Sequence, residues 1–102
     1  GLWDAVAPRV AQAENVRAAL ALVASGEAPL GIVYGSDAVA ARAAGEDVSV
    51  LGTFPPDSHA PIAYPAALLR GRDTPAARDL LDHLSSPAAR AAWEAQGFTV
   101  PD

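Results

Sequence analysis

Residues 14–37 read ENVRAALALVASGEAPLGIVYGSD, and this stretch decides the fold that the sequence predicts. Asn15 is a good helix N-cap, because its side-chain oxygen can accept a hydrogen bond from an early helix amide. The apolar side chains that follow recur at helical spacing: Val16, Leu20 and Val23. Gly26 stands where a helix commonly closes, and the apolar run 30–34 is typical of a short buried strand. The stretch therefore predicts a helix, a turn, a strand ending on a tyrosine, and a second turn.

Two more strands are predicted downstream of this unit. We expect a turn at residues 35–37, whose serine or aspartate would cap a short helix over 38–43. Residues 48–54 alternate in polarity and predict a strand. Residues 62–69 predict a third strand, which must be bent or lie at an edge because Pro65 cannot donate to a ladder.

The last third of the chain predicts two helices. Thr74 and Ser86 are each followed by proline, the pattern of an N-cap with proline at the first helical position. We expect helices over 75–84 and 87–96, after a glycine-containing link at 70–73 that is the best hinge candidate. Strand and helix alternation before this point indicates an α/β layered sheet, with the two terminal helices left to pack on another surface.

Composition limits the function classes. The chain has 102 residues, so it is one domain or part of one, and its apolar fraction of 51% argues against disorder. The net charge of −5 disfavours nucleic acid as a partner, and the lack of cysteine excludes disulfides and thiolate metal sites. No apolar run approaches the roughly 20 residues of a membrane span, and no signal peptide is evident. Residues 2–6 predict the tail of a helix with Trp3 packed inward, which suggests a fragment or a processed chain.

Catalytic motifs have no support in the sequence. Asp57, Ser58 and His59 are neighbours in a turn, whereas the members of a catalytic triad converge from separate elements. His83 is expected on a solvated helix face, and the two histidines lack the spacing of a metal site. The glycines form neither a dinucleotide-binding nor a phosphate-loop pattern. We therefore expect no enzyme activity, no cofactor and no directly bound metal ion.

One feature suggests a ligand site. The first amides of a helix have no partner within it, and the helix dipole adds partial positive charge, so the amides of Val16, Arg17 and Ala18 suit an oxyanion. The hydroxyl of Tyr34, at the end of the next strand, can donate to a ligand in the crevice of an open α/β sheet. Each feature alone is more often structural than functional.

Together, these residues closely resemble a known family. The segments 13–23 (AENVRAALALV) and 27–38 (EAPLGIVYGSDA) resemble the periplasmic molybdate-binding proteins of molybdate ABC transporters. The resemblance continues through shorter matches in the same order: Thr53-Phe54-Pro55, Asp57-Ser58-His59, Tyr64-Pro65, Ser86-Pro87-Ala88-Ala89 and Gly97-Phe98-Thr99. It covers nearly the whole chain, and only the loop 41–47 looks longer than the pattern.

The resemblance implies a type II periplasmic binding fold, an αβα layered protein with a mixed sheet. Residues 1–69 would form part of the C-terminal lobe, and 70–102 a hinge with helices that pack on the N-terminal lobe. Molybdate or tungstate would bind between the lobes, held here by the Val16 amide and the Tyr34 hydroxyl. The serine and alanine ligands of the family would lie outside this chain.

The implied function is that of the periplasmic substrate-binding component of a molybdate or tungstate importer, whose partner is the membrane permease. A half-site should bind the dianion weakly or not at all, because a buried dianion needs most of its oxygens satisfied. We also expect a homo-oligomer formed by segment exchange, which would cover the apolar faces of the terminal helices. An oxyanion-sensing effector domain of a cytoplasmic regulator remains the alternative.

Overall fold

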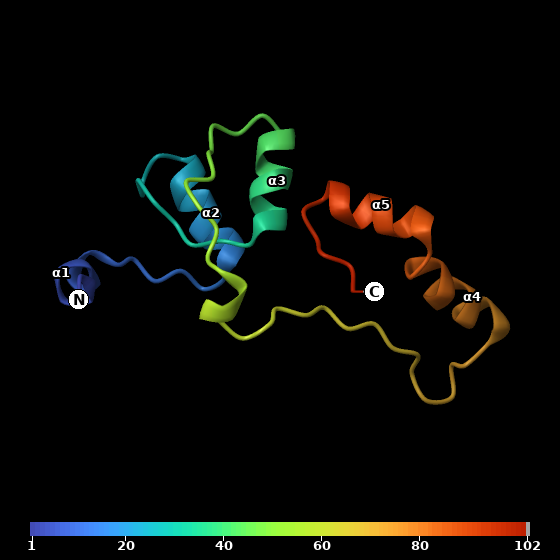
Figure 1. Cartoon of the computed structure of the whole chain (residues 1–102). Helices are drawn as coiled ribbons and strands as arrows, with labels where there is room; N and C mark the ends of the chain where they lie inside the picture. The colour runs from blue at the N-terminus through green and yellow to red at the C-terminus, as the bar shows by residue number, and fades with distance from the viewer. Residues whose placement is uncertain (102) are drawn as a thin grey trace. The chain divides into compact units, whose positions relative to one another are not determined.

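The computed structural model describes residues 1–101 and divides the chain into two compact units, Gly1–Ser49 and the part from Val50 onward. The elements are helical (Figure 1). In chain order they are α1 (Trp3–Val6), the 3-10 turn η1 (Ala7–Arg9), α2 (Val16–Ala24), α3 (Gly35–Ala43), the 3-10 turn η2 (Pro56–Ser58), α4 (Pro75–Leu84) and α5 (Pro87–Ala95).

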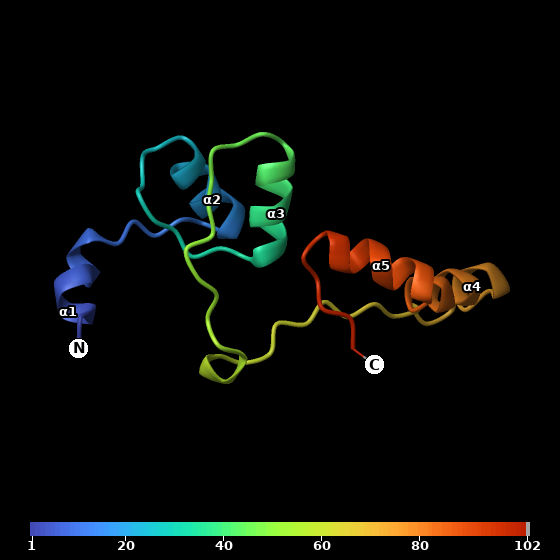
Figure 2. The ribbon, with the colours of Figure 1, turned by 45° about the horizontal axis from the view of Figure 1, so that its top comes forward.

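The first unit is built on α2 and α3, which lie side by side in both views (Figure 1, Figure 2). Asn15 caps α2 as predicted, since its Oδ1 accepts a hydrogen bond from the Ala18 amide at 2.9 Å. The buried residues of the described chain are Ala38 and Ala41, which share one face of α3. Small side chains on that face let the helices approach closely but remove little apolar surface from water.

The predicted start of α3 is wrong by three residues. The helix begins at Gly35 rather than Ala38, so residues 35–37 are its first turn, and neither Ser36 nor Asp37 is the cap. Tyr34 is the N-cap residue, with extended backbone (φ −75°, ψ 145°) and no side-chain cap hydrogen bond. Glycine and serine are tolerated in a first turn, and an acidic residue there is favoured by the helix dipole, so the helix extends back to Gly35.

The segment after α2 returns against that helix. Gly26 adopts φ +78°, the left-handed conformation that lets the chain reverse, and the Ala28 amide donates to the Leu22 carbonyl at 2.9 Å. At Gly31 the approach is so close that an added Cβ would lie 2.7 Å from a methyl group of Val23. The order of helix, turn and returning extended segment is therefore the predicted one.

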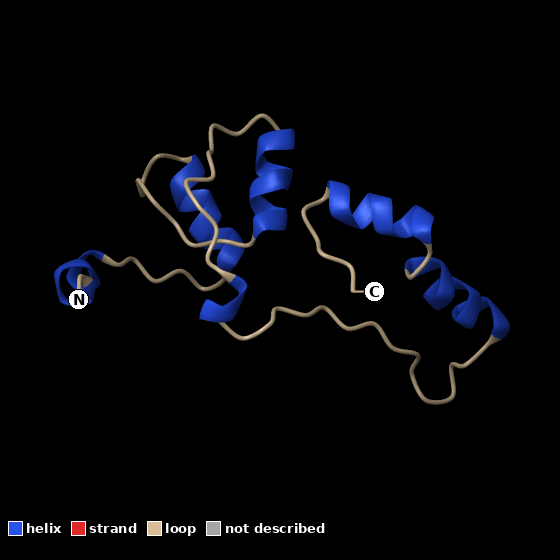
Figure 3. Cartoon of the chain, viewed as in Figure 1, coloured by secondary structure: helices blue, strands red, loops and turns tan. Residues whose placement is uncertain are grey.

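The strands themselves are not formed. Residues 1–101 contain helices, turns and loops, with no strand, as Figure 3 shows. The predicted strands 30–34, 48–54 and 62–69 have no paired neighbour, and a strand exists only where a second segment completes its ladder. Their large apolar side chains are largely exposed, for example Ile32 at 74% and Leu51 at 79%. The mixed sheet is thus not observed in this chain.

The N-terminal segment also differs from expectation. The helix α1 forms as predicted, but Trp3 is 68% exposed and does not pack inward. Pro8 lies near the start of η1, where the missing N–H of proline costs nothing.

In the second unit, α4 and α5 follow each other with the predicted caps. The hydroxyls of Thr74 and Ser86 each accept an amide hydrogen bond at 3.2 Å, from Ala77 and Ala89 respectively. The indole N–H of Trp93 donates to the carbonyl of Leu84 at 3.1 Å, which ties α5 to the end of α4. These local signals predicted both helices correctly.

The segment beyond α5 folds back on the same unit. Gly97 reverses the chain at φ +83°, and the ring of Phe98 then meets the rings of Trp93 and Tyr64 edge to face, at 5.9 and 5.7 Å between centroids. Arg90 donates to the carbonyls of Val100 and Pro101 at 3.0 and 2.9 Å. The end of the chain therefore packs back on its last helix.

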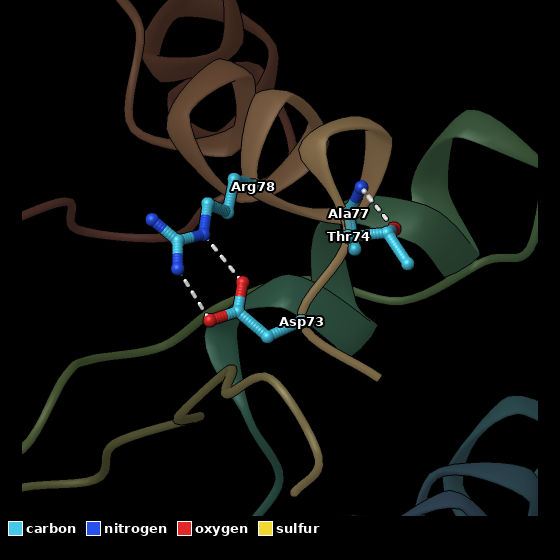
Figure 4. Close-up of polar contacts among 4 residues, drawn as sticks. All are labelled: Asp73, Thr74, Ala77 and Arg78. Atoms are coloured by element: carbon cyan, nitrogen blue, oxygen red, sulfur yellow. Dashed lines mark hydrogen bonds and ion pairs between the residues drawn. The ribbon is translucent and has the colours of Figure 1, made fainter. Parts of the chain in front are cut away.

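An ion pair fixes the start of α4. The guanidinium of Arg78 donates through Nε and Nη2 to the two carboxylate oxygens of Asp73, next to the Thr74 cap (Figure 4). This two-pronged contact lowers the pKa of the Asp73 carboxyl below its ordinary value, and it raises the pKa of Arg78.

The Asp73 pKa predicts a pH dependence. Because the folded-state pKa is lowered, the contribution of this pair to stability is fully present above the ordinary carboxyl pKa of about 3.9. It is lost as the pH falls through the lowered pKa. An NMR titration should show the Asp73 pKa rising toward its ordinary value in Arg78→Gln, and less so in Arg78→Lys, which keeps the charge but not the fork. An unchanged pKa in Arg78→Gln would contradict this assignment.

Candidate functional site

The first predicted site residue, Val16, is the first residue of α2. The Asn15 side chain accepts from the Ala18 amide, and the Asn15 carbonyl accepts from the Ala19 amide at 3.1 Å. The amides of Val16 and Arg17 precede these and have no acceptor within the helix. They are two of the three amides that the sequence assigned to an oxyanion. The third, that of Ala18, donates to the Asn15 side chain instead.

The second predicted site residue, Tyr34, is the residue that immediately precedes α3. It is 37% exposed, and its extended backbone leads directly into the first turn of the helix. Tyr34 therefore lies at a helix N-terminus rather than at the end of a paired strand. The amide donors that follow it, from Gly35 to Asp37, are also free of intrahelical acceptors.

The first turns of α2 and α3 are joined by an ion pair that sequence reasoning missed. Arg17 Nε lies 3.6 Å from Asp37 Oδ1, and the Asp37 side chain is only 16% exposed whereas that of Arg17 is 88% exposed. The two partners are twenty positions apart in sequence, so no local pattern signals the contact. It shows that the helix starts carrying the two predicted site residues lie next to each other.

The two helix N-termini favour binding of an anion, whereas the carboxylate of Asp37 opposes it. Two helix N-termini contribute partial positive charge and unpaired amides. Asp37, in the first turn of α3, places a carboxylate at the same end, and Arg17 offsets it. The hydrogen-bond donors at these two helix starts are therefore mainly neutral amides.

The other candidate residues do not assemble into a reactive site. The Ser58 hydroxyl donates to the Pro55 carbonyl at 2.6 Å, and Nδ1 of His59 lies 2.8 Å from the Ala60 carbonyl oxygen, as expected in a turn. His83 is exposed on α4, where it borders a shallow apolar hollow with Trp93. Within residues 1–101 no three His, Asp or Glu side chains are grouped so as to hold a metal ion. No helix in this part of the chain combines the length and apolar character of a membrane span.

Comparison with known proteins places this chain among solute-binding proteins. It is 47% identical over 98% of its length to the molybdate-binding protein ModA of Escherichia coli, and 43% identical over 97% to ModA of Haemophilus influenzae. It is also 29% identical to a Bacillus subtilis protein described as a putative ABC transporter substrate-binding lipoprotein, YvgL. The chain spans 37% of the length of each of these relatives. The resemblance to molybdate-binding proteins predicted from the sequence is thereby confirmed.

A family model matches nearly the entire chain, over residues 1–99, far more than a shared local motif would cover. The protein belongs to the bacterial extracellular solute-binding protein family.

Proposed function

We propose that this chain is the C-terminal part of a periplasmic protein that binds molybdate or tungstate and delivers it to the permease of an ABC importer. In this proposal it is a binding protein and not an enzyme, and it needs no cofactor. The observation that carries the proposal is the identity of 47% and 43% to two proteins named for molybdate binding, over nearly the whole chain. Membership of an extracellular family favours import over the alternative of a cytoplasmic sensor.

The proposed ligand groups are the Val16 amide and the Tyr34 hydroxyl. Support comes from the Asn15 cap, which leaves the Val16 amide without a helical acceptor, and from the ion pair that joins the two helix starts. Neutral donors suit this protein because its net charge is −5, so attraction by a basic surface is not available. The ligand is the tetrahedral dianion itself, so the metal atom is reached only through its oxygens.

The larger fold is part of the proposal. In it, residues 1–69 form part of the C-terminal α/β lobe, and residues 70–102 form a hinge and helices that pack on the N-terminal lobe. The exposed apolar side chains of 30–34, 48–54 and 62–69 support this, because they lie on the segments that the sequence predicts as buried strands. Pairing with further strands would place them inside a mixed sheet with helices on both faces.

Calorimetric titration tests the function. The full-length gene product containing this chain is expected to release or take up heat with molybdate and with tungstate, and much less with sulfate. The isolated 102-residue chain is expected to bind weakly or not at all, since a dianion with part of its oxygens unpaired is poorly held. Absence of heat with every anion in the full-length product would overturn the proposal.

The isolated chain is expected to self-associate. Its exposed apolar segments and helix faces need cover, and a second copy that exchanges its α4–α5 segment would supply it. Light scattering of the isolated chain at micromolar concentration should give at least twice the mass of one copy. A monomer under these conditions would contradict the exchange, and the full-length gene product serves as the comparison that should remain monomeric.

A further inference from the structure

We propose that the Arg17–Asp37 ion pair sets how strongly the site discriminates between tetrahedral dianions and tetrahedral monoanions. The inference rests on the proposed function, because it concerns the same oxyanion site. It adds two side chains that donate nothing to the ligand but carry full charges at the helix starts that would hold it. The charges of these two side chains would determine specificity through their electrostatic interaction with the bound anion.

The placement of Asp37 is the first reason. Asp37 lies in the first turn of α3, three residues after Tyr34, and one helical turn rises only about 5.4 Å. Its side chain is 16% exposed, so water screens its charge incompletely. A carboxylate so placed opposes any anion held at the helix starts, and it opposes a dianion twice as strongly as a monoanion.

The placement of Arg17 is the second reason. Arg17 follows Val16, and its Nε lies 3.6 Å from the Asp37 carboxylate, so its charge compensates that of Asp37 at the same end of the helices. Its side chain is 88% exposed, which leaves its field more strongly screened than that of its partner. The compensation is therefore incomplete, and the two residues act with opposite signs and unequal strength.

A merely structural reading of the pair predicts something different. The contact is longer than a hydrogen bond, and ion pairs with one exposed partner contribute little to stability. If the pair only held α2 against α3, removal of either partner would misalign the same donors. Both substitutions would then weaken all tetrahedral anions in the same direction.

Titration of charge variants with two anions separates these readings. Molybdate serves as the dianion, and perrhenate, a tetrahedral oxyanion of similar size, serves as the monoanion. At low ionic strength, Asp37→Asn in the full-length gene product should tighten molybdate binding about tenfold and perrhenate binding about threefold. Arg17→Gln should weaken molybdate binding about threefold and perrhenate binding less than twofold, with the smaller effect following from its exposure.

Matched controls come from the other end of α3. Arg42 is in the last turn of that helix, about 7.5 Å farther along it than Asp37, and Asp47 lies in the exposed loop beyond. Arg42→Gln and Asp47→Asn therefore remove the same kinds of charge away from the two helix starts. These variants should leave the ratio of molybdate to perrhenate affinity within about twofold of the unsubstituted protein. Thermal unfolding midpoints of all variants would show that each is folded.

The titrations separate a failure of the proposed function from a failure of the role proposed for the Arg17–Asp37 pair. If the unsubstituted protein binds no molybdate, the proposed function fails first. If it binds, but both Arg17→Gln and Asp37→Asn weaken molybdate and perrhenate equally, the pair is structural and the inference is overturned. An affinity ratio that moves in opposite directions for the two variants, and moves less at higher salt, supports it.

Discussion

Replacing Val16 with proline is expected to weaken molybdate binding about 100-fold while leaving α2 intact. Proline lacks the amide hydrogen that would bind the ligand, and a lost hydrogen bond to a charged group costs roughly 1.5–3 kcal/mol. Its ring also occupies the space in front of the former amide, where a ligand oxygen would lie. Since a factor of 100 corresponds to about 2.8 kcal/mol, the loss should reach the upper end of this range.

The local backbone conformation accepts proline at position 16 without a change in the helix. Val16 is the first residue of its helix, the position at which proline is favoured, and Asn15 before it already has the extended backbone that proline requires (φ −157°, ψ 174°). Helix content by circular dichroism and the unfolding midpoint should therefore be little changed. Val16→Ala is the matched control, because it shortens the same side chain but keeps the amide. Equal affinities for the alanine and proline variants, measured by calorimetry on the full-length gene product, would remove the Val16 amide from the site.

The second large effect is expected from Tyr34→Phe. This change removes only the hydroxyl, and loss of one hydrogen bond to a dianion should weaken binding by roughly 1.5–3 kcal/mol, or about 10- to 100-fold. The unfolding midpoint of the variant should be measured beside its affinity, so that a loss of binding is separated from a loss of stability.

Tyr64→Phe is the control for Tyr34→Phe. Tyr64 is the other tyrosine of the chain and packs edge to face against Phe98 in the second unit. The Tyr64→Phe substitution therefore removes the same hydroxyl group from a position with no proposed ligand role. Its molybdate affinity should equal that of the unsubstituted protein. An affinity for Tyr34→Phe that matches this control would mean that the Tyr34 hydroxyl does not touch the ligand.

Local signals in the sequence predicted the helices well. The caps at Asn15, Thr74 and Ser86 depend on side chains that reach amides three residues away, so the pattern contains all the information needed. The start of α3 was predicted too late because Ser36 and Asp37 are better side-chain caps than Tyr34. There the backbone conformation of Tyr34, and not a side-chain cap, determines where the helix begins.

Features that depend on distant partners were not predictable in the same way. The apolar runs 30–34, 48–54 and 62–69 indicate burial, but a strand needs a neighbour whose identity no local pattern reveals. Trp3 was expected to be packed and is exposed for a similar reason. At the site, the Val16 and Tyr34 assignments came from a family resemblance and remain predictions, while the Arg17–Asp37 contact could be found only in three dimensions.

The link that precedes α4 has a mechanical consequence. The Arg72 amide donates to the Leu69 carbonyl, the Thr74 amide donates to the Arg72 carbonyl, and Asp73 is clamped to Arg78. Gly71 within this segment adopts φ +77°, so the segment forms a hydrogen-bonded turn and not an extended linker. A rotation of α4 about this link would therefore have to break these hydrogen bonds and the Asp73–Arg78 ion pair.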